Sequence, residues 1–144
     1  MKTPLFTLAL TLLITASSWA TKPGWTSSLD KATQVASASK KYILLDFTGS
    51  DWCQYCIQMD KEVFSTPSFK SFAKQNLVLV ELDFPKEHAI SPTVLAQNVK
   101  LGQQYNINGF PTSVLLDSSG HEVARWEGFN KDLVSQLKEK THKN

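Results

Sequence analysis

The sequence predicts an α/β fold in which helices flank a central mixed β-sheet. Short apolar runs rich in Leu, Ile and Val alternate with segments of helical periodicity, which is the pattern of strands joined by helical crossovers. The last two apolar runs are separated only by residues 118–120, which end in Gly and are typical of a hairpin turn. Crossovers make strands parallel and hairpins make them antiparallel, so we expect both kinds of pairing in the sheet.

Composition limits the class of protein. The chain has 144 residues, of which 42% are apolar and 19% are charged, values close to the average of a single globular domain. Fifteen Lys and Arg residues against 13 Asp and Glu residues give a net charge of +2. Nucleic-acid binding usually needs a much denser positive surface, so we expect no nucleic-acid partner.

Residues 1–20 have the features of a signal peptide. Lys2 provides the positive charge, residues 5–14 form the apolar segment, and Ala20 ends a cleavage motif of small residues. The apolar segment is shorter than the roughly 20 residues of a membrane-spanning helix, although an uncleaved amino-terminal anchor is the alternative. Cleavage would leave one domain, residues 21–144, in the periplasm or in another exported location where disulfides persist.

The first half of this domain predicts two helices around one strand. Helical spacing of apolar residues indicates a helix over residues 25–40, and a continuous apolar run indicates a strand over residues 42–47 that is buried on both faces. Turn residues follow. Helical periodicity then runs from residue 52 to about residue 75, with a break or kink near Pro67.

The second half predicts a strand, a helix, a hairpin and a closing helix. In chain order these are a strand over residues 77–83, a helix over residues 92–105 with Ser91 as its N-cap, a hairpin of strands 112–117 and 121–126, and a helix over residues 131–140. We expect the first two or three strands of the sheet to be parallel and the hairpin to be antiparallel.

The candidate chemistry lies in a C-x-x-C pair that opens a predicted helix directly after a buried strand. At the helix N-terminus, unpaired amides and the macrodipole favour a thiolate on Cys53, and Cys56 lies one turn further, within disulfide distance. We interpret Cys53 as the nucleophile that attacks a disulfide and Cys56 as the thiol that resolves the mixed disulfide. Gln54 and Tyr55 lie between the cysteines and should tune the redox potential.

Two alternative roles of the cysteine pair remain open. A purely structural disulfide would add little stability, because the loop that it closes is so short. A metal site would need further ligands, and the only histidines are His88, His121 and His142. We favour the redox interpretation and expect neither a metal nor a cofactor.

Three motifs give the chain a resemblance to a known family. They are Leu45-Asp46-Phe47, Trp52-Cys53-Gln54-Tyr55-Cys56 and Gly109-Phe110-Pro111-Thr112. In this order and at these separations they resemble the thioredoxin superfamily, over nearly all of residues 21–144. Residues 46–53 are most similar to exported thioredoxin-like disulfide oxidoreductases. The resemblance implies a thioredoxin-like form of the α/β fold.

The resemblance also implies roles in substrate binding. Pro111 matches the family's cis-proline, which faces the cysteine pair, and the backbone at Phe110 matches the edge that pairs with an extended substrate. Without the family, Pro111 would be interpreted as an ordinary trans proline that starts an edge strand. Trp52 matches the tryptophan whose ring shields one side of the disulfide.

Asp46 matches the family's buried acid, which assists proton transfer at the second cysteine. A carboxyl group in an apolar strand should have a raised pKa, as a general acid or base needs. One extra residue separates Asp46 from Cys53 compared with the family pattern, so a carboxylate held by turn amides is the alternative. Glu81 lies where thioredoxins often carry a buried Lys, and is either a second buried carboxyl group or a solvated strand residue. The loop at 84–91 is longer than in a minimal thioredoxin; we interpret it as a neutral surface insertion, and a loop that flanks the active site is the alternative.

The sequence therefore predicts an exported thiol-disulfide oxidoreductase that acts on protein disulfides. Gln54 and Tyr55 bring no cation to Cys53, and Asp51 opposes thiolate formation, which favours a reductase over an oxidase. A disulfide isomerase and a non-catalytic module that binds unfolded chains or a metal are the alternatives. The expected partners are exported proteins with disulfides and, by the resemblance, a membrane thiol reductase as electron donor. We expect the chain to be a monomer.

Overall fold

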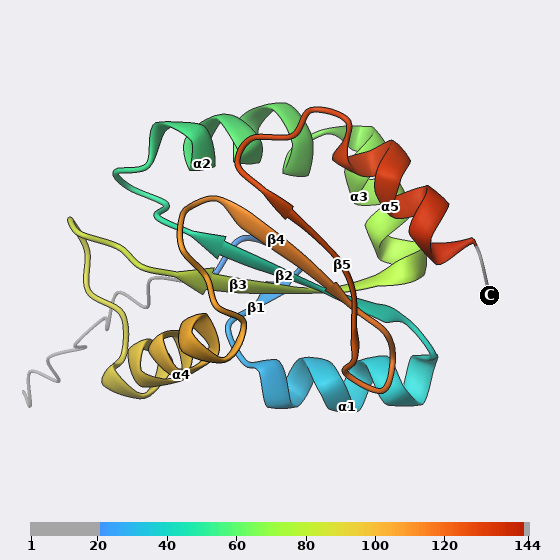
Figure 1. Ribbon diagram of the computed structural model, residues 1–144, viewed down its shortest axis with the longest axis horizontal. Coiled ribbons are helices and arrows are strands. Elements are labelled where there is room, and N and C mark those ends of the chain that lie inside the picture. Colours follow the sequence, from blue (N-terminus) through green and yellow to red (C-terminus); the bar gives the residue numbers. More distant parts are fainter. Residues whose placement is uncertain (1–20, 143–144) are drawn as a thin grey trace, which may run out of the picture.

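The computed structural model describes residues 21–142, so the predicted signal peptide lies outside the described residues. Five strands form one sheet in the order β1-β3-β2-β4-β5 (Figure 1). The strands are β1 (Trp25–Thr26), β2 (Tyr42–Thr48), β3 (Leu77–Asp83), β4 (Thr112–Leu116) and β5 (Glu122–Glu127). The four strands expected from the sequence are confirmed, each end lying within one residue of its predicted position.

The sheet is mixed, as predicted. β3 runs parallel to β2 and β1, whereas β4 is antiparallel to both β2 and β5. Of the predicted strands, the first two are thus parallel and the third is not. The reason is that the chain enters β4 at the end of the sheet where β2 finishes, with Thr112 paired to Phe47.

Helices cover both faces of the sheet (Figure 1). One face carries α1 (Leu29–Ser39) and α4 (Pro92–Gln104), and the other carries α2 (Gln54–Met59), α3 (Pro67–Asn76) and α5 (Leu133–Thr141). The ends of α4 and α5 lie within two residues of their predicted positions. The α/β class with a flanked mixed sheet is therefore confirmed.

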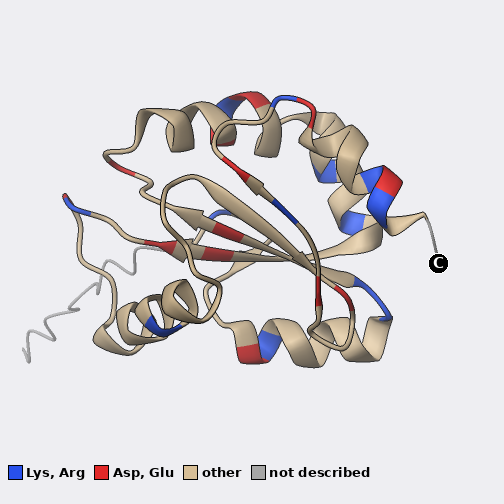
Figure 2. Cartoon of the chain, in the orientation of Figure 1, with Lys and Arg blue, Asp and Glu red and all other residues tan. Residues whose placement is uncertain are grey.

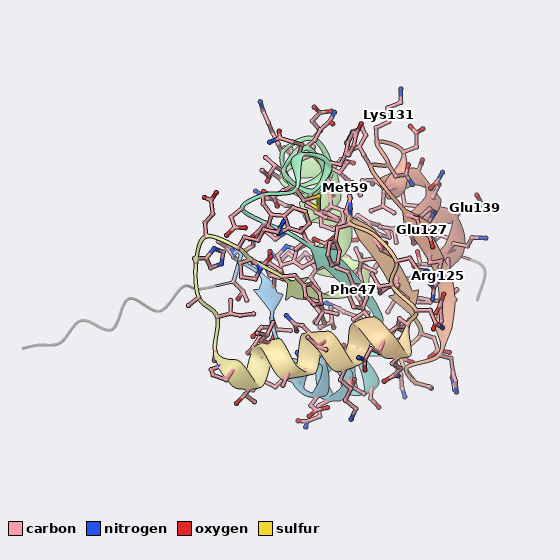
Figure 3. All side chains as sticks on the ribbon, turned by 60° about the vertical axis from the view of Figure 1, so that its left-hand side comes forward. Phe47, Met59, Arg125, Glu127, Lys131 and Glu139 are labelled. Carbon is pink, nitrogen blue, oxygen red and sulfur yellow. A yellow bond between two sulfur atoms is a disulfide. The ribbon has the colours of Figure 1, made fainter. Side chains whose placement is uncertain are left out.

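Alternation along β2 decides which of its side chains face α2. Leu44 packs in a buried cluster with Met59 of α2, whereas Leu45 and Phe47 pack in the cluster on the α1 and α4 side (Figure 3). Successive side chains of a strand point to opposite faces. Asp46 therefore faces the α2 side of the sheet.

The helix predicted over residues 25–40 begins later than expected. The first two of these residues form β1, which pairs with β3 at the edge of the sheet. Ser28 is the N-cap of α1, and its hydroxyl oxygen accepts a hydrogen bond from the Lys31 amide at 3.3 Å. A strand of two residues shows no alternation, so periodicity could not separate it from the helix that follows.

The helical stretch predicted from residue 52 to about residue 75 is divided. α2 passes directly into the π-helix η1 (Asp60–Phe64). α3 follows after Thr66, whose hydroxyl oxygen caps it, with Pro67 in the first turn. Proline has no amide hydrogen to donate and is tolerated only at such a first turn, so the predicted break at Pro67 is confirmed.

Candidate redox site

The cysteine pair lies at the start of α2. Cys53 and Cys56 form a disulfide with a Cα–Cα distance of 5.2 Å. Cys53 is the N-cap of α2, and its Sγ accepts a hydrogen bond from the Cys56 amide at 3.2 Å. Cys53 is also the more exposed of the two, at 8% against 3%. The helix end thus favours negative charge on the sulfur that a substrate can reach.

Gly49 connects the turn before the cysteines to the second sulfur. Its amide donates to Cys56 Sγ at 3.5 Å, and its carbonyl oxygen accepts from the Cys53 amide at 2.9 Å. A β-carbon at this position would lie 2.5 Å from the Trp52 ring. The close approach of backbone and indole therefore requires glycine.

Trp52 belongs to an aromatic cluster beside the cysteines. Its ring meets Phe110 edge to face at a centroid distance of 6.1 Å, and Phe110 stacks on Phe84 at 5.0 Å. The indole N–H donates to the Phe84 carbonyl oxygen at 2.8 Å, and Lys86 Nζ lies 3.8 Å from the indole centroid. The structure thus brings together Trp52 and Phe110, which the sequence analysis identified, with Phe84 and Lys86, which it missed.

The Phe110–Pro111 peptide bond is cis, as the resemblance implied. Pro111 does not start an edge strand, because it precedes β4, which lies between β2 and β5. Its carbonyl oxygen accepts a hydrogen bond from the Gly128 amide at 2.8 Å. The trans alternative is therefore wrong.

On the α2 side of the sheet, two carboxyl groups share one ammonium group. Asp46 of β2 and Glu81 of β3 are register partners, and their side chains are 2% and 10% exposed. Figure 2 shows acidic segments on both of these central strands. Lys22 Nζ lies 3.5 Å from Asp46 Oδ2, 3.1 Å from Glu81 Oε1 and 3.1 Å from Asp60 Oδ1. Glu81 is therefore a second buried carboxyl group, and the solvated alternative is wrong.

Burial raises the pKa of Asp46 to about 6 against the opposing effect of Lys22, while Glu81 and Asp60 raise it further. Oδ1 of Asp46 has no hydrogen-bond partner within the described part of the chain. The expected raised pKa is thus confirmed, and the alternative of a carboxylate held by turn amides is wrong.

Lys22 is the residue of this site that the sequence analysis missed. Burial alone would lower the pKa of Lys22, but the three carboxylates outweigh burial and hold the pKa above its ordinary value, so the group stays charged. Two carboxyl groups in apolar strands do signal that a cation is needed. Lys22 precedes Asp46 by 24 residues, however, and no spacing rule connects them.

The loop at 84–91 is attached to the site, so its interpretation as a neutral insertion is wrong. Asp51 accepts hydrogen bonds from the Lys86 and Glu87 amides at 3.0 and 2.7 Å, and its Oδ2 lies 3.1 Å from His88 Nδ1. Burial alone would raise the pKa of Asp51, but these hydrogen bonds and His88 hold it below its ordinary value. The charge that was expected to oppose a Cys53 thiolate is therefore already partnered by the loop.

The remaining predicted residues lie at the surface of α2. Gln54 is exposed, and Tyr55 is 64% exposed. Across residues 21–142, no group of three His, Cys, Asp or Glu side chains is arranged to hold a metal ion. No helix in that range has the length and apolar character needed to cross a membrane.

The fold, the C-x-x-C disulfide and the cis-proline together define a class, that of the thioredoxin-like proteins. A model of the thioredoxin-like domain family matches residues 29–136, and the chain belongs to this family.

Three curated relatives give more detail. The chain is 38% identical over 98 residues to the disulfide bond reductase DsbH of Chlamydia pneumoniae. The aligned region covers 68% of this chain and 59% of the relative. It is 28% identical over 113 residues to the thioredoxin-related protein DsbJ of the same organism, covering 78% of this chain and 32% of the relative. The thiol:disulfide interchange protein DsbD of Vibrio vulnificus is 32% identical over 103 residues, covering 70% and 16%. The chain thus spans less than two thirds of the length of each relative.

Solved structures agree with this assignment. A DsbH oxidoreductase matches with a TM-score of 0.75 and 32% identity, over 87% of this chain and 92% of that chain. A thioredoxin from Thermus thermophilus, at 24% identity and a TM-score of 0.59, shows the same fold. The resemblance to the thioredoxin superfamily is confirmed.

Proposed function

We propose that the chain is a thiol-disulfide oxidoreductase that reduces disulfides of exported proteins. One observation carries the proposal: the Cys53–Cys56 disulfide opens α2, and a buried carboxyl group of raised pKa lies on the sheet face that this helix covers. A structural disulfide would need no such acid beside it, whereas dithiol chemistry needs a group that exchanges protons with the second cysteine.

In the reduced protein, the Cys53 thiolate attacks one sulfur of a substrate disulfide. The bond between Cys53 and the substrate forms as the substrate S–S bond breaks, and the released sulfur leaves as a thiolate that takes up a proton. Cys56, once deprotonated, attacks Cys53 Sγ. The Cys53–Cys56 bond then forms, the second substrate sulfur leaves, and two electrons have passed to the substrate.

Asp46 is the proposed base for Cys56. With a pKa of about 6 the carboxyl group is mostly ionised at neutral pH, yet it can hold a proton during the reaction. The Gly49 amide, which donates to Cys56 Sγ, would stabilise the Cys56 thiolate.

Substrate binding would use the surface beside the cysteines. The backbone before the cis-proline Pro111 can pair with an extended segment, and Trp52 and Phe110 can contact its side chains. Exposed Tyr55 and Ile57 on α2 add apolar area next to this surface. With a net charge of only +2, selectivity should come from apolar contacts and backbone pairing rather than from charge.

Two observations support the direction of reduction. The relative with 38% identity is named a disulfide bond reductase. The residues between the cysteines, Gln54 and Tyr55, bring no cation that would stabilise a Cys53 thiolate strongly, and strong stabilisation of the thiolate is what makes a dithiol an oxidant. We also propose export after cleavage near Ala20, and a membrane thiol reductase as the electron donor.

Reduction of insulin by dithiothreitol tests the proposal. The wild-type chain should accelerate precipitation of the insulin B chain, and Cys53→Ser should abolish the acceleration. Cys56→Ser should instead accumulate a mixed disulfide with the substrate, because attack remains and resolution is lost. Ser119→Ala, in the distant hairpin turn, is the matched control and should retain the wild-type rate.

Equal rates for wild-type and Cys53→Ser would overturn the proposal. Binding of unfolded chains that survives replacement of both cysteines by Ser would then favour the binding-module alternative. The reduction potential against glutathione separates a reductase from an isomerase or an oxidase.

A further inference from the structure

The ammonium group of Lys22 is held at the centre of the carboxyl cluster beneath α2. Its Nζ is within 3.5 Å of carboxylate oxygens from three elements: Asp46 on β2, Glu81 on β3 and Asp60 at the start of η1. The same Nζ lies 4.4 Å from the centroid of the Trp25 ring and 5.1 Å from that of Phe64. Contacts on so many sides fix the position of the charge.

We propose that Lys22 is a positioning residue for the redox reaction: from the amino-terminal segment it sets the proton affinity of Asp46 and thereby the pH at which Cys56 can resolve a mixed disulfide. This inference rests on the proposed function, since it concerns the proton that Cys56 gives up to Asp46. Among the ion pairs of residues 21–142, Lys22 is the cation in every pair that involves Asp46, Glu81 or Asp60.

The cluster lies on the same face of the active-site helix as the second cysteine. The Asp60 amide donates to the carbonyl oxygen of Cys56, one helical turn away, and residues four apart lie on one side of a helix. Asp46 reaches this region from below, since it faces the α2 side of the sheet with Leu44 on the same strand. Lys22 thus bridges the helix that carries Cys56 and the strand that carries its proposed base.

The charges in the cluster do not cancel. When all three carboxyl groups are ionised, one ammonium group faces three negative charges, of which those on Asp46 and Glu81 are buried on adjacent, register-paired positions. Like charges at such positions disfavour joint ionisation, and the cation is what permits Asp46 to ionise near neutral pH. One Asp46 oxygen faces Lys22, and the other has no partner in the described chain and can receive a proton.

A short turn places Lys22 in the cluster. Its carbonyl oxygen accepts from the Trp25 amide at 2.9 Å, and Gly24 adopts a φ of +84°, which favours glycine. Trp25 then pairs with Leu79, two residues before Glu81 on β3. The edge strand β1 therefore has a specific role, which is to anchor a cation that the two central strands do not supply.

The proton balance of the step is closed. Cys56 loses a proton to Asp46, the Cys56 thiolate attacks Cys53 Sγ, and the outgoing substrate sulfur carries away the bonding electron pair as a thiolate. Asp46 then returns its proton to solvent or to that thiolate. If Lys22 is removed, Asp46 holds a proton at neutral pH and cannot accept the one on Cys56.

The test measures the second step directly. The reduced chain is mixed with oxidised glutathione and quenched with acid, and conversion of the Cys53–glutathione mixed disulfide into the Cys53–Cys56 disulfide is followed by mass spectrometry from pH 4 to pH 9. Lys22→Met should move the midpoint of the pH profile upward by roughly 1 to 3 units, the usual effect of losing an opposite charge at this range. Glu81→Gln should move the midpoint downward. Lys22→Arg keeps the positive charge and should retain the wild-type midpoint.

Lys61→Met is the matched control. It removes one Lys next to Asp60 on η1, but its side chain is exposed, so the midpoint should stay at the wild-type value. If Lys22→Met does not fold, as judged by circular dichroism, the double variant Lys22→Met with Glu81→Gln removes a cation and an anion together. The midpoint of this double variant should lie above that of Glu81→Gln alone, because the double variant also lacks the ammonium group.

A wild-type midpoint in Lys22→Met, or no shift in Glu81→Gln, would overturn the inference. Failure of the proposed function looks different: the wild-type chain itself would then form no Cys53–Cys56 disulfide at any pH. The two failures are therefore distinguishable.

Discussion

The buried carboxyl group of Asp46 destabilises the fold when it is ionised, relative to its protonated form. Its pKa in the folded chain, about 6, lies above its ordinary value of 3.8. The contribution of Asp46 to stability is therefore fully present below pH 3.8 and is lost as the pH rises through about 6. At pH 8 the ionised group costs about 3 kcal/mol of folding free energy relative to the protonated group.

Asp46→Asn should consequently stabilise the oxidised chain at pH 8 and not at pH 4. We expect the free energy of unfolding in urea to rise by up to about 3 kcal/mol at pH 8. The same variant should slow insulin reduction, because Cys56 loses its proposed base. An equal gain in stability at both pH values would show that ionisation of Asp46 is not the cause.

Gly49 shows a steric requirement at a single atom. Gly49→Ala would place a β-carbon 2.5 Å from the Trp52 ring, so the indole must move away from its position. We expect a loss of about 1 to 3 kcal/mol in unfolding free energy, as for other overpacked sites, together with a changed Trp fluorescence spectrum. Gly109→Ala is the control, since nothing lies within 4 Å of its added carbon. A loss that persists in a Trp52→Ala background would contradict the proposed clash.

At this scale the sequence identifies residues whose role depends on local spacing and misses those that act across the fold. Cys53 and Cys56 could be found because their chemistry requires a fixed separation within one helical turn. Pro111 required the family resemblance, since a cis bond leaves no trace in periodicity. Lys22 could not be found, because its three partners come from elements that only the folded chain brings together.

At the scale of elements, the side chain of Asp51 is one of the groups that hold the 84–91 loop. Asp51 accepts hydrogen bonds from two successive loop amides, those of Lys86 and Glu87. Its pKa lies below 3.8, so these bonds are fully present above that pH and are lost as the pH falls through the lowered value. The loop should therefore remain attached to the redox site through the neutral range.

Asp51→Asn should loosen this loop without unfolding the sheet. Hydrogen exchange at the Lys86 and Glu87 amides should become faster, while exchange in β2 and β3 should stay at the wild-type rate. Asp30→Asn, in the exposed first turn of α1, removes the same charge far from the loop and should leave these amides protected. Unchanged protection in Asp51→Asn would show that other contacts hold the loop.

Elements of ordinary length were predictable, and short or irregular ones were not. The continuous apolar runs of β2 and β3 and the capped start of α4 gave their bounds almost to the residue. β1 has only two residues, and η1 differs from an α-helix by its hydrogen-bond pattern rather than by its side chains. The 84–91 loop has no periodic pattern, and its attachment depends on residues distant in the sequence, such as Asp51 in the turn before α2.

At the scale of the whole molecule, both edges of the sheet are poorly suited to pair with another chain. β1 offers only two residues. β5 carries charged side chains, among them Arg125, which is paired with Glu122 at 2.6 Å, and Glu127 (Figure 3). Short edges and charged edges both oppose strand pairing between molecules.

We therefore expect the domain to be monomeric in solution. Sedimentation equilibrium of residues 21–144 should give the mass of one chain across the micromolar range, in the oxidised and in the reduced form. A concentration-dependent dimer would contradict this expectation, and Arg125→Ala would then show whether β5 is the interface.

The register of the two central strands has a consequence for folding. Asp46 pairs with Glu81, and both point to the side of the sheet where Lys22 lies. A slip of β2 by one residue would turn every side chain of that strand to the opposite face. Asp46 would then lie among the apolar side chains that pack with Phe47, such as Phe110 and Tyr105, and away from Lys22. The charged cluster thus penalises misaligned strands, so the same three residues that serve the proposed chemistry also select the native alignment of the sheet.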